Sequence, residues 1–275
     1  MRRSARDGGG AGKLVPTPLG SHSPRLAGVR ALLHKKGRSE QRRFAIEGLT
    51  LLQEALQAGR RPEALYVTAA GLATLGALAN GFADRLFIVA PGPMERLSDL
   101  ETAPGIVAVY PEELDELGEL LSDGNPGLVL GVADPGNAGT LMRSADIFGL
   151  RNVIFDESAI EPYNPKLVRA TMGALFRVGL AISTVESLVV QARRHSYAVV
   201  VADRSGSPLS GFTFARKSLI VIGHERRGAQ GWLEQADDAV AIPQGGHGQS
   251  LNAAVAGSIV MYAFSQQFGS ASPGS

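Results

Sequence analysis

Short apolar runs recur through the second half of the chain, at residues 128–132, 152–155, 198–202, 219–222 and 239–242. Within a run the apolar residues follow one another without polar alternation, which is typical of strands buried on both faces. Segments with helical spacing separate the runs, and this indicates helices that cover both sides of a central sheet. This half of the chain therefore predicts an α/β fold with a parallel sheet.

The first half has a similar pattern with shorter elements. Strands are predicted at residues 44–46, 64–68, 86–90 and 102–109, and apolar residues recur at helical spacing over residues 49–59. An acidic segment with helical character follows the last of these strands. We therefore expect a second, smaller α/β unit in front of the parallel sheet.

Composition along the chain suggests where these units begin and end. Residues 1–24 are rich in Gly, Ser, Pro and Arg without an apolar period, and residues 122–127 read Ser-Asp-Gly-Asn-Pro-Gly, the strongest linker in the chain. We expect a disordered basic tail over residues 1–24, a small α/β domain over residues 25–121 and a parallel-sheet domain over residues 127–268, each domain with its own core.

The residue types present exclude several kinds of chemistry. The 275 residues include no Cys, so disulfides, thiolate metal sites and a cysteine nucleophile are excluded. The five His residues lack metal-ligand spacing, and no apolar stretch is long enough for a signal peptide or a membrane span. We therefore expect a cytoplasmic protein that needs neither a metal ion nor a membrane.

Charge is distributed unevenly, although the net charge is only +1. Residues 1–43 contain eleven Lys or Arg and two acidic residues, a net charge of +9, whereas the remainder of the chain carries −8. Clustered cations gain affinity for phosphate backbones by releasing counterions, so a basic arm on an acidic body suggests a polyanionic partner. The alternative is a solvated tail that only improves solubility.

Polar and glycine-rich segments follow three of the predicted strands, where open α/β sheets bind their ligands. In the first segment, Asn137 stands where a helix N-cap is expected and Arg143 follows inside the helix. In the second, Gly223 and Gly228 flank Glu225. Each segment also has a purely structural interpretation: a capped helix with a surface Arg in the first case, and a salt bridge from Glu225 in the second.

The third segment is a glycine-rich loop over residues 243–249, followed by Ser250 and Asn252 and then by a helix of small residues. Such a loop offers backbone N–H groups to a ligand, and small side chains permit tight helix packing. The structural alternative is a loop that precedes a well-packed helix.

Taken together, the three segments resemble the signature motifs of the SpoU (TrmH-like) family of RNA 2′-O-ribose methyltransferases, in the knotted SPOUT superfamily. The resemblance extends to residues 163–176, and residues 43–48 and 104–108 resemble the ends of the small RNA substrate-binding domain that many members carry. Two departures are His224, where Asn is common, and a loop that begins Gln244-Gly-Gly instead of a Met-containing turn. The motif residues are Asn137 and Arg143; Gly223, Glu225 and Gly228; and Ile242, Ser250, Leu251 and Asn252.

The resemblance implies a C-terminal trefoil knot, a homodimer packed through residues 253–264, and S-adenosyl-L-methionine bent into the knot. It implies catalytic roles for Asn137, Arg143, Glu225, Ser250 and Asn252. The implied cofactor contacts are Ala202, Asp203, Ile222, Gly223, His224, Gly228, Ile242, Gln244 and Leu251. The basic segment and the family's intermediate segment add the expected RNA contacts Lys35, Lys36, Arg38, Arg42, Arg43, Lys166 and Arg169.

The residue chemistry also favours ribose as the methyl acceptor. Methylation of pyrimidine C5 usually needs a covalent Cys, which this chain lacks, whereas a 2′-hydroxyl needs orientation and help in losing its proton. Arg143 would act as a proton acceptor or, as its high pKa favours, as the group that stabilises the alkoxide. We expect ribose methylation of 23S-type ribosomal RNA. The alternatives are a transfer RNA enzyme, a base-nitrogen methyltransferase or a non-catalytic RNA-binding assembly protein.

Overall fold

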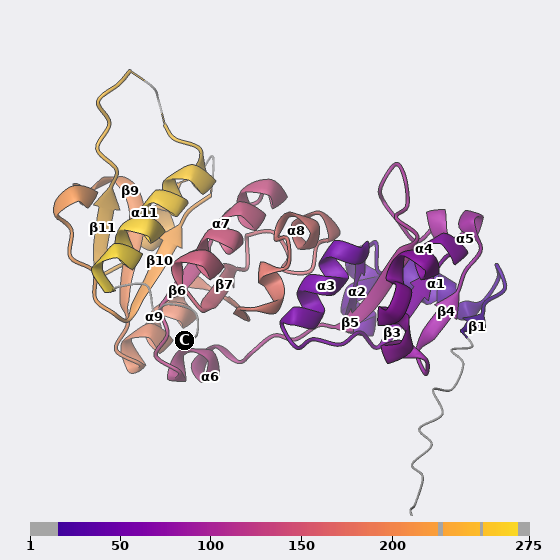
Figure 1. Cartoon of the computed structure of the whole chain (residues 1–275). Helices are drawn as coiled ribbons and strands as arrows, with labels where there is room; N and C mark the ends of the chain where they lie inside the picture. The colour runs from indigo at the N-terminus through magenta and orange to yellow at the C-terminus, as the bar shows by residue number, and fades with distance from the viewer. Residues whose placement is uncertain (1–15, 225–227, 248–249, 269–275) are drawn as a thin grey trace, which may run out of the picture.

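The computed structural model describes residues 16–224, 228–247 and 250–268. Within these residues the strands form two sheets that lie at opposite ends of an elongated molecule (Figure 1). The first sheet has the order β1-β4-β3-β5-β2, in which β5 runs antiparallel to both β3 and β2. Its strands are β1 (Thr17–Pro18), β2 (Arg43–Glu47), β3 (Ala64–Val67), β4 (Leu86–Ile88) and β5 (Ile106–Pro111).

The second sheet is parallel throughout its described strands, in the order β11-β9-β10-β6-β7-β8. This confirms the predicted α/β fold with a parallel sheet. The chain adds strands on one side of β6 and then returns to add the rest on the other side, so a switch point lies between β6 and β10. The strands are β6 (Gly127–Leu130), β7 (Asn152–Asp156), β8 (Gly179–Ser183), β9 (Ala198–Pro208), β10 (Ser218–Ile222) and β11 (Asp238–Ala241).

Helices cover both faces of the parallel sheet. Successive side chains along each strand point to opposite faces, and because they are apolar, both faces must be buried. One face packs on α7 (Pro135–Phe148), α8 (Pro165–Ala170) and α11 (Ala253–Phe268). The other face packs on α6 (Leu117–Ser122), α9 (Val185–Arg194) and α10 (Gln230–Leu233). Ile220 and Ile222 of β10 join the first cluster, whereas Leu219 and Val221 join the second, which explains the continuous apolar run.

The first sheet is also covered on both faces. On one side lie α3 (Leu49–Gln57), α4 (Ala69–Leu75) and the 3-10 helix Gly76–Phe82. On the other side α1 (Pro24–Ala31) and α5 (Pro91–Glu95) pack through Leu26, Val29 and Met94. A further short helix, α2 (Lys35–Gln41), leads into β2.

Two segments differ from the sequence-based expectation. The Thr17–Pro18 strand pairs with β4, so regular structure begins inside the segment expected to be a tail. The helix α6 (Leu117–Ser122) was expected in the first domain but packs against β8 and α9 of the second sheet, because Leu117, Leu120 and Leu121 are buried there. The chain therefore passes from one sheet to the other before α6 rather than after it.

The two units share one apolar cluster, in addition to the separate cluster that each unit has on the other face of its sheet. Phe44 of β2 stacks on Tyr163 with ring centroids 4.5 Å apart, and on Phe176 at 6.2 Å. The Tyr163 hydroxyl also donates to the Glu113 carbonyl oxygen at 2.6 Å and accepts from the Glu113 N–H at 2.9 Å. The segment 163–176 thus forms the contact between the two units, and burial of these rings fixes their relative position.

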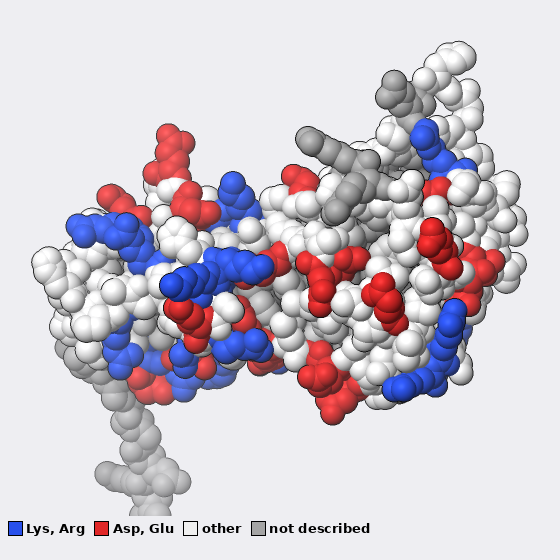
Figure 2. Space-filling view, turned by 180° about the vertical axis from the view of Figure 1, so that it is seen from behind, with Lys and Arg blue, Asp and Glu red and all other residues white. Residues whose placement is uncertain are grey.

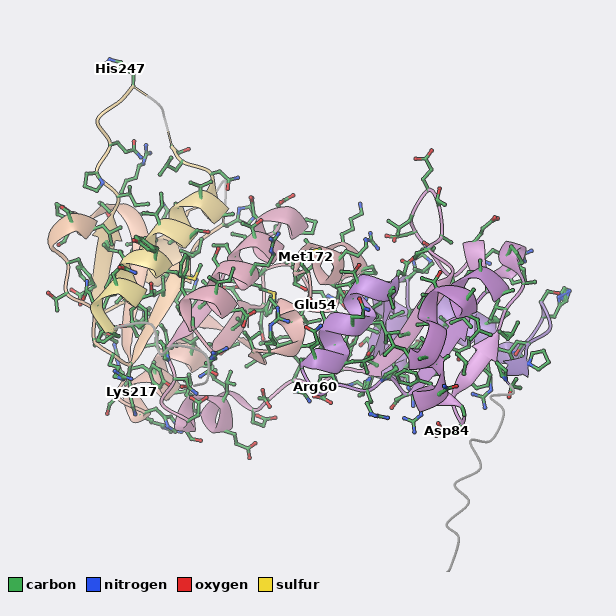
Figure 3. The ribbon with its side chains drawn as sticks, viewed as in Figure 1. Glu54, Arg60, Asp84, Met172, Lys217 and His247 are labelled. Carbon is green, nitrogen blue, oxygen red and sulfur yellow. The ribbon has the colours of Figure 1, made fainter. Side chains whose placement is uncertain are left out.

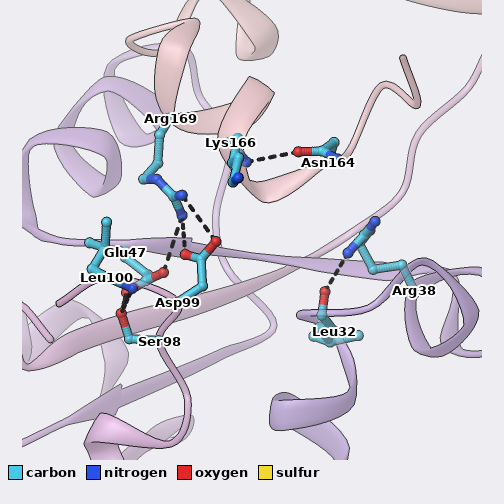
Figure 4. A network of polar contacts seen from close by, with 9 residues as sticks. All are labelled: Leu32, Arg38, Glu47, Ser98, Asp99, Leu100, Asn164, Lys166 and Arg169. Atoms are coloured by element: carbon cyan, nitrogen blue, oxygen red, sulfur yellow. Dashed lines mark hydrogen bonds and ion pairs between the residues drawn. The ribbon is translucent and has the colours of Figure 1, made fainter. Parts of the chain in front are cut away.

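Ion pairs also join the two units, and Figure 4 shows those of Arg169 with Asp99 and Glu47. Arg38 donates two hydrogen bonds to Glu161, at 2.9 and 2.7 Å, and a third to the Leu32 carbonyl oxygen at 2.8 Å. Arg169 bonds Asp99 at 2.5 Å and lies 3.5 Å from Glu47. Each pair joins a residue of the first unit to one of the second, so charge as well as packing holds the two units together.

Among the described residues, no helix has both the length and the apolar character that a membrane crossing requires.

Candidate active site

A cavity of about 650 Å³ lies where β9, β10 and β11 end. Because the strands are parallel, the loops that leave them meet at one edge of the sheet, and the cavity lies between those loops. All nine residues that the sequence predicted as cofactor contacts line it: Ala202, Asp203, Ile222, Gly223, His224, Gly228, Ile242, Gln244 and Leu251. The sequence therefore predicted which residues the fold brings together here.

The wall formed by β9 exists because the pairing between β9 and β11 is irregular. Ala239 pairs with Val201, but the next residue, Val240, pairs with Ser207, so residues 202–206 bulge out of the ladder. Asp203 accepts hydrogen bonds from the backbone N–H and the hydroxyl of Ser205, at 2.9 and 2.8 Å, which fixes the turn. The bulge directs residues 202–204 to the cavity.

The loop after β10 is closed by backbone bonds at its base. The N–H of His224 donates to the Gly228 carbonyl oxygen at 3.0 Å, and the N–H of Gly228 returns a bond to His224 at 2.8 Å. A Cβ on Gly223 would lie 2.6 Å from that Gly228 oxygen, and Gly228 has a φ of +65°. Both glycines are therefore needed for this turn. The predicted catalytic residue Glu225 lies in this loop, outside the described residues.

The third motif begins α11. The Asn252 side-chain oxygen accepts from the N–H groups of Ala254 and Val255, at 2.9 and 3.2 Å, and so caps the helix. The Asn252 side-chain nitrogen donates to the Asn137 side-chain oxygen at 2.9 Å, across 115 positions of sequence. Ser250 and Asn252 line the cavity. The first and third motifs thus meet beside the cavity, but neither Asn137 nor Arg143 is among the described residues that line it.

The start of α7 differs in detail from the expectation. The N-cap is Asp134, whose carboxylate accepts from the Asn137 N–H at 2.7 Å, while Asn137 lies inside the first turn. This frees the Asn137 side chain to meet Asn252. About two turns further along the helix, Ser144 contacts Ser258 of α11 at 2.7 Å between hydroxyl oxygens. Arg143 lies on an exposed side of α7 and forms no ion pair with a described residue.

Comparison with known proteins places this arrangement in a family. The model of the SpoU rRNA Methylase family matches residues 128–262, and that of the MRM3-like substrate binding domain matches residues 23–108. The chain belongs to the SpoU rRNA methylase family. This SpoU member is 28% identical to a 23S rRNA guanosine 2′-O-methyltransferase of Bacillus subtilis, RlmP, over 83% of this chain and 90% of that protein.

Solved structures agree with the fold. An AdoMet-bound rRNA methyltransferase of Sinorhizobium meliloti has a TM-score of 0.81 and 26% identity, covering 92% of this chain and 99% of its own. The SpoU methyltransferase AviRb of Streptomyces viridochromogenes, in complex with AdoMet, has a TM-score of 0.77 and 27% identity, covering 90% and 98%. The SpoU family prediction made from the motifs is confirmed.

The RNA contacts predicted for this SpoU member are in very different environments. Only 3% of the Arg38 side chain is exposed and its guanidinium is held by Glu161, so its predicted phosphate contact is wrong for this structure. Arg42 lies near Glu112 at 3.8 Å, Arg43 bonds Glu63 at 2.5 Å, Lys36 lies 3.8 Å from Glu40, and Arg169 bonds Asp99. Lys35 and Lys166 are exposed or partly exposed and form no ion pair with a described residue.

Sequence reasoning missed several residues of the site. Arg204, Ala229 and Val240 also line the cavity. Arg204 directly follows the predicted Asp203, so the position after a strand end was the available signal. Among the described residues, no group of three or more His, Asp or Glu is placed to hold a metal ion.

Proposed function

We propose that this SpoU family member transfers a methyl group from S-adenosylmethionine to a ribose 2′-hydroxyl of 23S-type ribosomal RNA. The observation that carries the proposal is the Asn137–Asn252 hydrogen bond, which joins the first and third motifs beside a cavity formed by the second and third. The rRNA 2′-O-methyltransferase from Bacillus subtilis and the AdoMet-bound relatives support the substrate and the cofactor.

The cavity suits S-adenosylmethionine in size and lining. Its volume of about 650 Å³ lies within the range of roughly 300–1,000 Å³ for small-molecule sites. Ile222, Ile242 and Leu251 offer apolar surface and peptide groups for an adenine ring, and Asp203 offers a carboxylate. When bound, the cofactor supplies an electrophilic methyl group on a sulfonium. The loops that hold it would exclude water and orient that methyl toward the ribose.

Arg143 would act on the ribose oxygen as the proton leaves. A guanidinium with its ordinary high pKa is a poor base, but it can bind a phosphate and stabilise a developing alkoxide with parallel N–H donors. Asn137 and Asn252 would help to orient the ribose, and Ser250 and Glu225 remain part of the proposed catalytic cluster. Because Arg143 is exposed, the RNA or a second subunit would complete its surroundings.

A homodimer is part of the proposal. On α11, Val255, Ile259 and Tyr262 are exposed, Tyr262 to 52%, and on α7 Ile147 is 74% exposed. The two helices pack together, and Phe148, next to Ile147, contacts Tyr262 with ring centroids 5.8 Å apart, so exposed apolar side chains of both helices lie on the side of α7 that follows Arg143. We propose that a second copy covers these side chains and that the chain after β11 passes through the implied knot. The protein would act in the cytoplasm, where it meets ribosomal RNA.

The test uses purified full-length protein, S-adenosylmethionine with a labelled methyl group, and ribosomal RNA from cells that lack the protein. Alkaline hydrolysis cuts RNA through a free 2′-hydroxyl, so ribose methylation leaves labelled dinucleotides. That is the expected product. Labelled mononucleotides would indicate base methylation, and absence of label would favour the non-catalytic RNA-binding alternative; either result contradicts the proposal.

A further inference from the structure

A second hollow lies in the N-terminal unit, between α1, α5 and the turn before α1. Its volume is about 400 Å³. Among the described residues that line it are two arginines and two histidines, Arg30, Arg96, His22 and His34, and no Asp or Glu. The remaining polar lining consists of the hydroxyls of Ser21 and Ser23. We call this hollow the α1–α5 groove.

Two arginines of this groove form no ion pair with a described residue, unlike several other arginines of the same unit. Arg38, Arg43 and Arg60 bond Glu161, Glu63 and Glu113. By contrast, Arg30 and Arg96 are exposed and form no ion pair with a described residue. In the view of Figure 2, most of the visible Lys and Arg lie over the half that holds this unit, with acidic side chains beside many of them. The groove therefore brings two arginines without a described acidic partner and two histidines together in one hollow.

We infer that the α1–α5 groove binds the phosphodiester backbone of the RNA substrate. This inference rests on the proposed action on RNA and adds a binding site to it. Two guanidinium groups can each bind a phosphate oxygen with paired N–H donors. Imidazole N–H groups and serine hydroxyls donate to the same kind of oxygen. The lining offers many donors and no carboxylate that would repel the phosphate.

Buried apolar residues form the base of the α1–α5 groove. Leu26 of α1 and Leu97, just after α5, are 5% and 2% exposed and belong to one apolar cluster beneath the groove. Packing therefore fixes the backbone positions from which the charged side chains extend before RNA arrives, which reduces the entropy lost on binding. The ion pairs at Arg38 and Arg169 hold the N-terminal unit on the parallel-sheet unit. A phosphate bound in the groove would thus have a fixed relation to the cavity.

A matched pair of double variants tests the inference. Arg30→Ala with Arg96→Ala removes the two arginines of the groove. Arg60→Ala with Arg85→Ala removes the same charge from the same unit, but at positions that already pair with Glu113 and Asp84. Both are measured by fluorescence anisotropy with a labelled RNA stem-loop of mixed sequence over a series of salt concentrations.

Each phosphate contact contributes about 0.7 to 0.9 to the slope of log affinity against log salt. The groove variant should lose about 1.4 to 1.8 of that slope and bind RNA at least about tenfold more weakly at low salt. The control variant should keep a slope within about 0.5 of the parent. Equal loss in both variants would mean that only net charge matters, and an unchanged slope in the groove variant would mean that RNA does not contact it. Either result overturns the inference.

Melting temperatures of both variants, expected to equal that of the parent, show that the exposed substitutions leave the fold intact. Cofactor binding by calorimetry should also be unchanged, because the groove lies in the other unit. The binding readout does not depend on methyl transfer. If the protein bound RNA through the groove but transferred no methyl group, the proposed function would fail and the inference would stand.

Discussion

The contact between the two units and the site at the edge of the parallel sheet use polar residues in opposite ways. In the contact, Arg38 is buried and its guanidinium makes three hydrogen bonds. At the site, Arg143 is exposed and forms no ion pair with a described residue. A charge that is fully paired and buried holds structure, whereas an exposed charge without a described acidic partner is available for a substrate.

Glycine residues also have different roles at the contact between the units and at the site. At the contact, a Cβ on Gly173 would lie 2.5 Å from the Cβ of Glu54, so this glycine permits close packing of the two units. At the site, Gly223 permits a loop to turn tightly beside the cavity. Figure 3 shows Glu54 and Met172 at the contact, and His247 far from it on the loop that leaves β11. We expect changes at the contact to affect stability first, and changes at the site to affect cofactor binding or turnover first.

The largest effect is expected at Arg143. Arg143→Ala should lower single-turnover methyl transfer by about 10² to 10⁴, the range for losing a positioned proton-transfer or oxyanion-stabilising group. Arg143→Lys should rescue poorly, because an ammonium lacks the planar pair of donors. The assay uses saturating RNA and cofactor, with cofactor affinity from calorimetry as the control. Turnover within about threefold of the parent would remove Arg143 from the mechanism.

Changes at Arg38 should lower the stability of the protein, in contrast to Arg143, where the expected effect is on methyl transfer. Arg38→Met leaves the Glu161 carboxylate without its partner, and breaking a buried pair in this way costs about 3 to 5 kcal/mol of stability. Replacing both residues, Arg38→Met with Glu161→Leu, should recover most of the loss, since no charge is then left unpaired. Urea denaturation measures both variants. A single variant as stable as the parent would show that this pair does not hold the units together.

A smaller effect is expected at Gly223. Gly223→Ala places a Cβ 2.6 Å from the Gly228 oxygen, so the loop beside the cavity must shift and cofactor affinity should fall by about 10- to 100-fold, or 1.4 to 2.7 kcal/mol. Gly231→Ala in α10 is the matched control, because a Cβ there meets nothing within 4 Å. Calorimetry that gave the two variants the same affinity would contradict the role assigned to this loop.

The smallest effect concerns Glu47 at the contact. Burial raises the pKa of Glu47, against the opposing effects of the Ser98 hydroxyl and Arg169. A carboxyl whose pKa is higher in the folded state stabilises the protein at low pH and loses that contribution as pH rises through the folded pKa. Because Gln does not titrate, the Glu47→Gln variant does not lose stability in this way. Its free energy of unfolding should therefore increase relative to that of the parent as the pH rises above 4.5, by less than about 1 kcal/mol. Urea denaturation at several pH values would contradict this if the difference did not change.

The sequence predicted the parallel sheet and the cavity well because both follow from local pattern. Continuous apolar runs mark buried strands, and loops after parallel strands must meet at one edge. The burial of Arg38 could not be predicted, since its partner Glu161 lies 123 positions away and the neighbouring cations look solvated. The strand Gly179–Ser183 was missed because it is short and its apolar run is broken by polar or small residues.

The N-cap of α7 and the α1–α5 groove also depend on three-dimensional geometry that the sequence does not show. Asp134 and Asn137 are both good N-cap residues, and only the backbone geometry decides that Asp134 is the cap. His22 and Arg96 are far apart in sequence and come together through the packing of α1 and α5. The basic charge near the N-terminus was visible in the sequence, but which of its residues are neutralised by acids depends on long-range contacts.

The most direct test of the central claim is a map of 2′-O-methylated nucleotides in ribosomal RNA from three strains. One strain carries the parent protein, one lacks it, and one carries Arg143→Ala at the same protein level. We predict a ribose methylation in 23S-type RNA that is present with the parent and absent from the other two. Identical maps from the strains with and without the protein would contradict the proposed function, and full methylation with Arg143→Ala would contradict the assigned site.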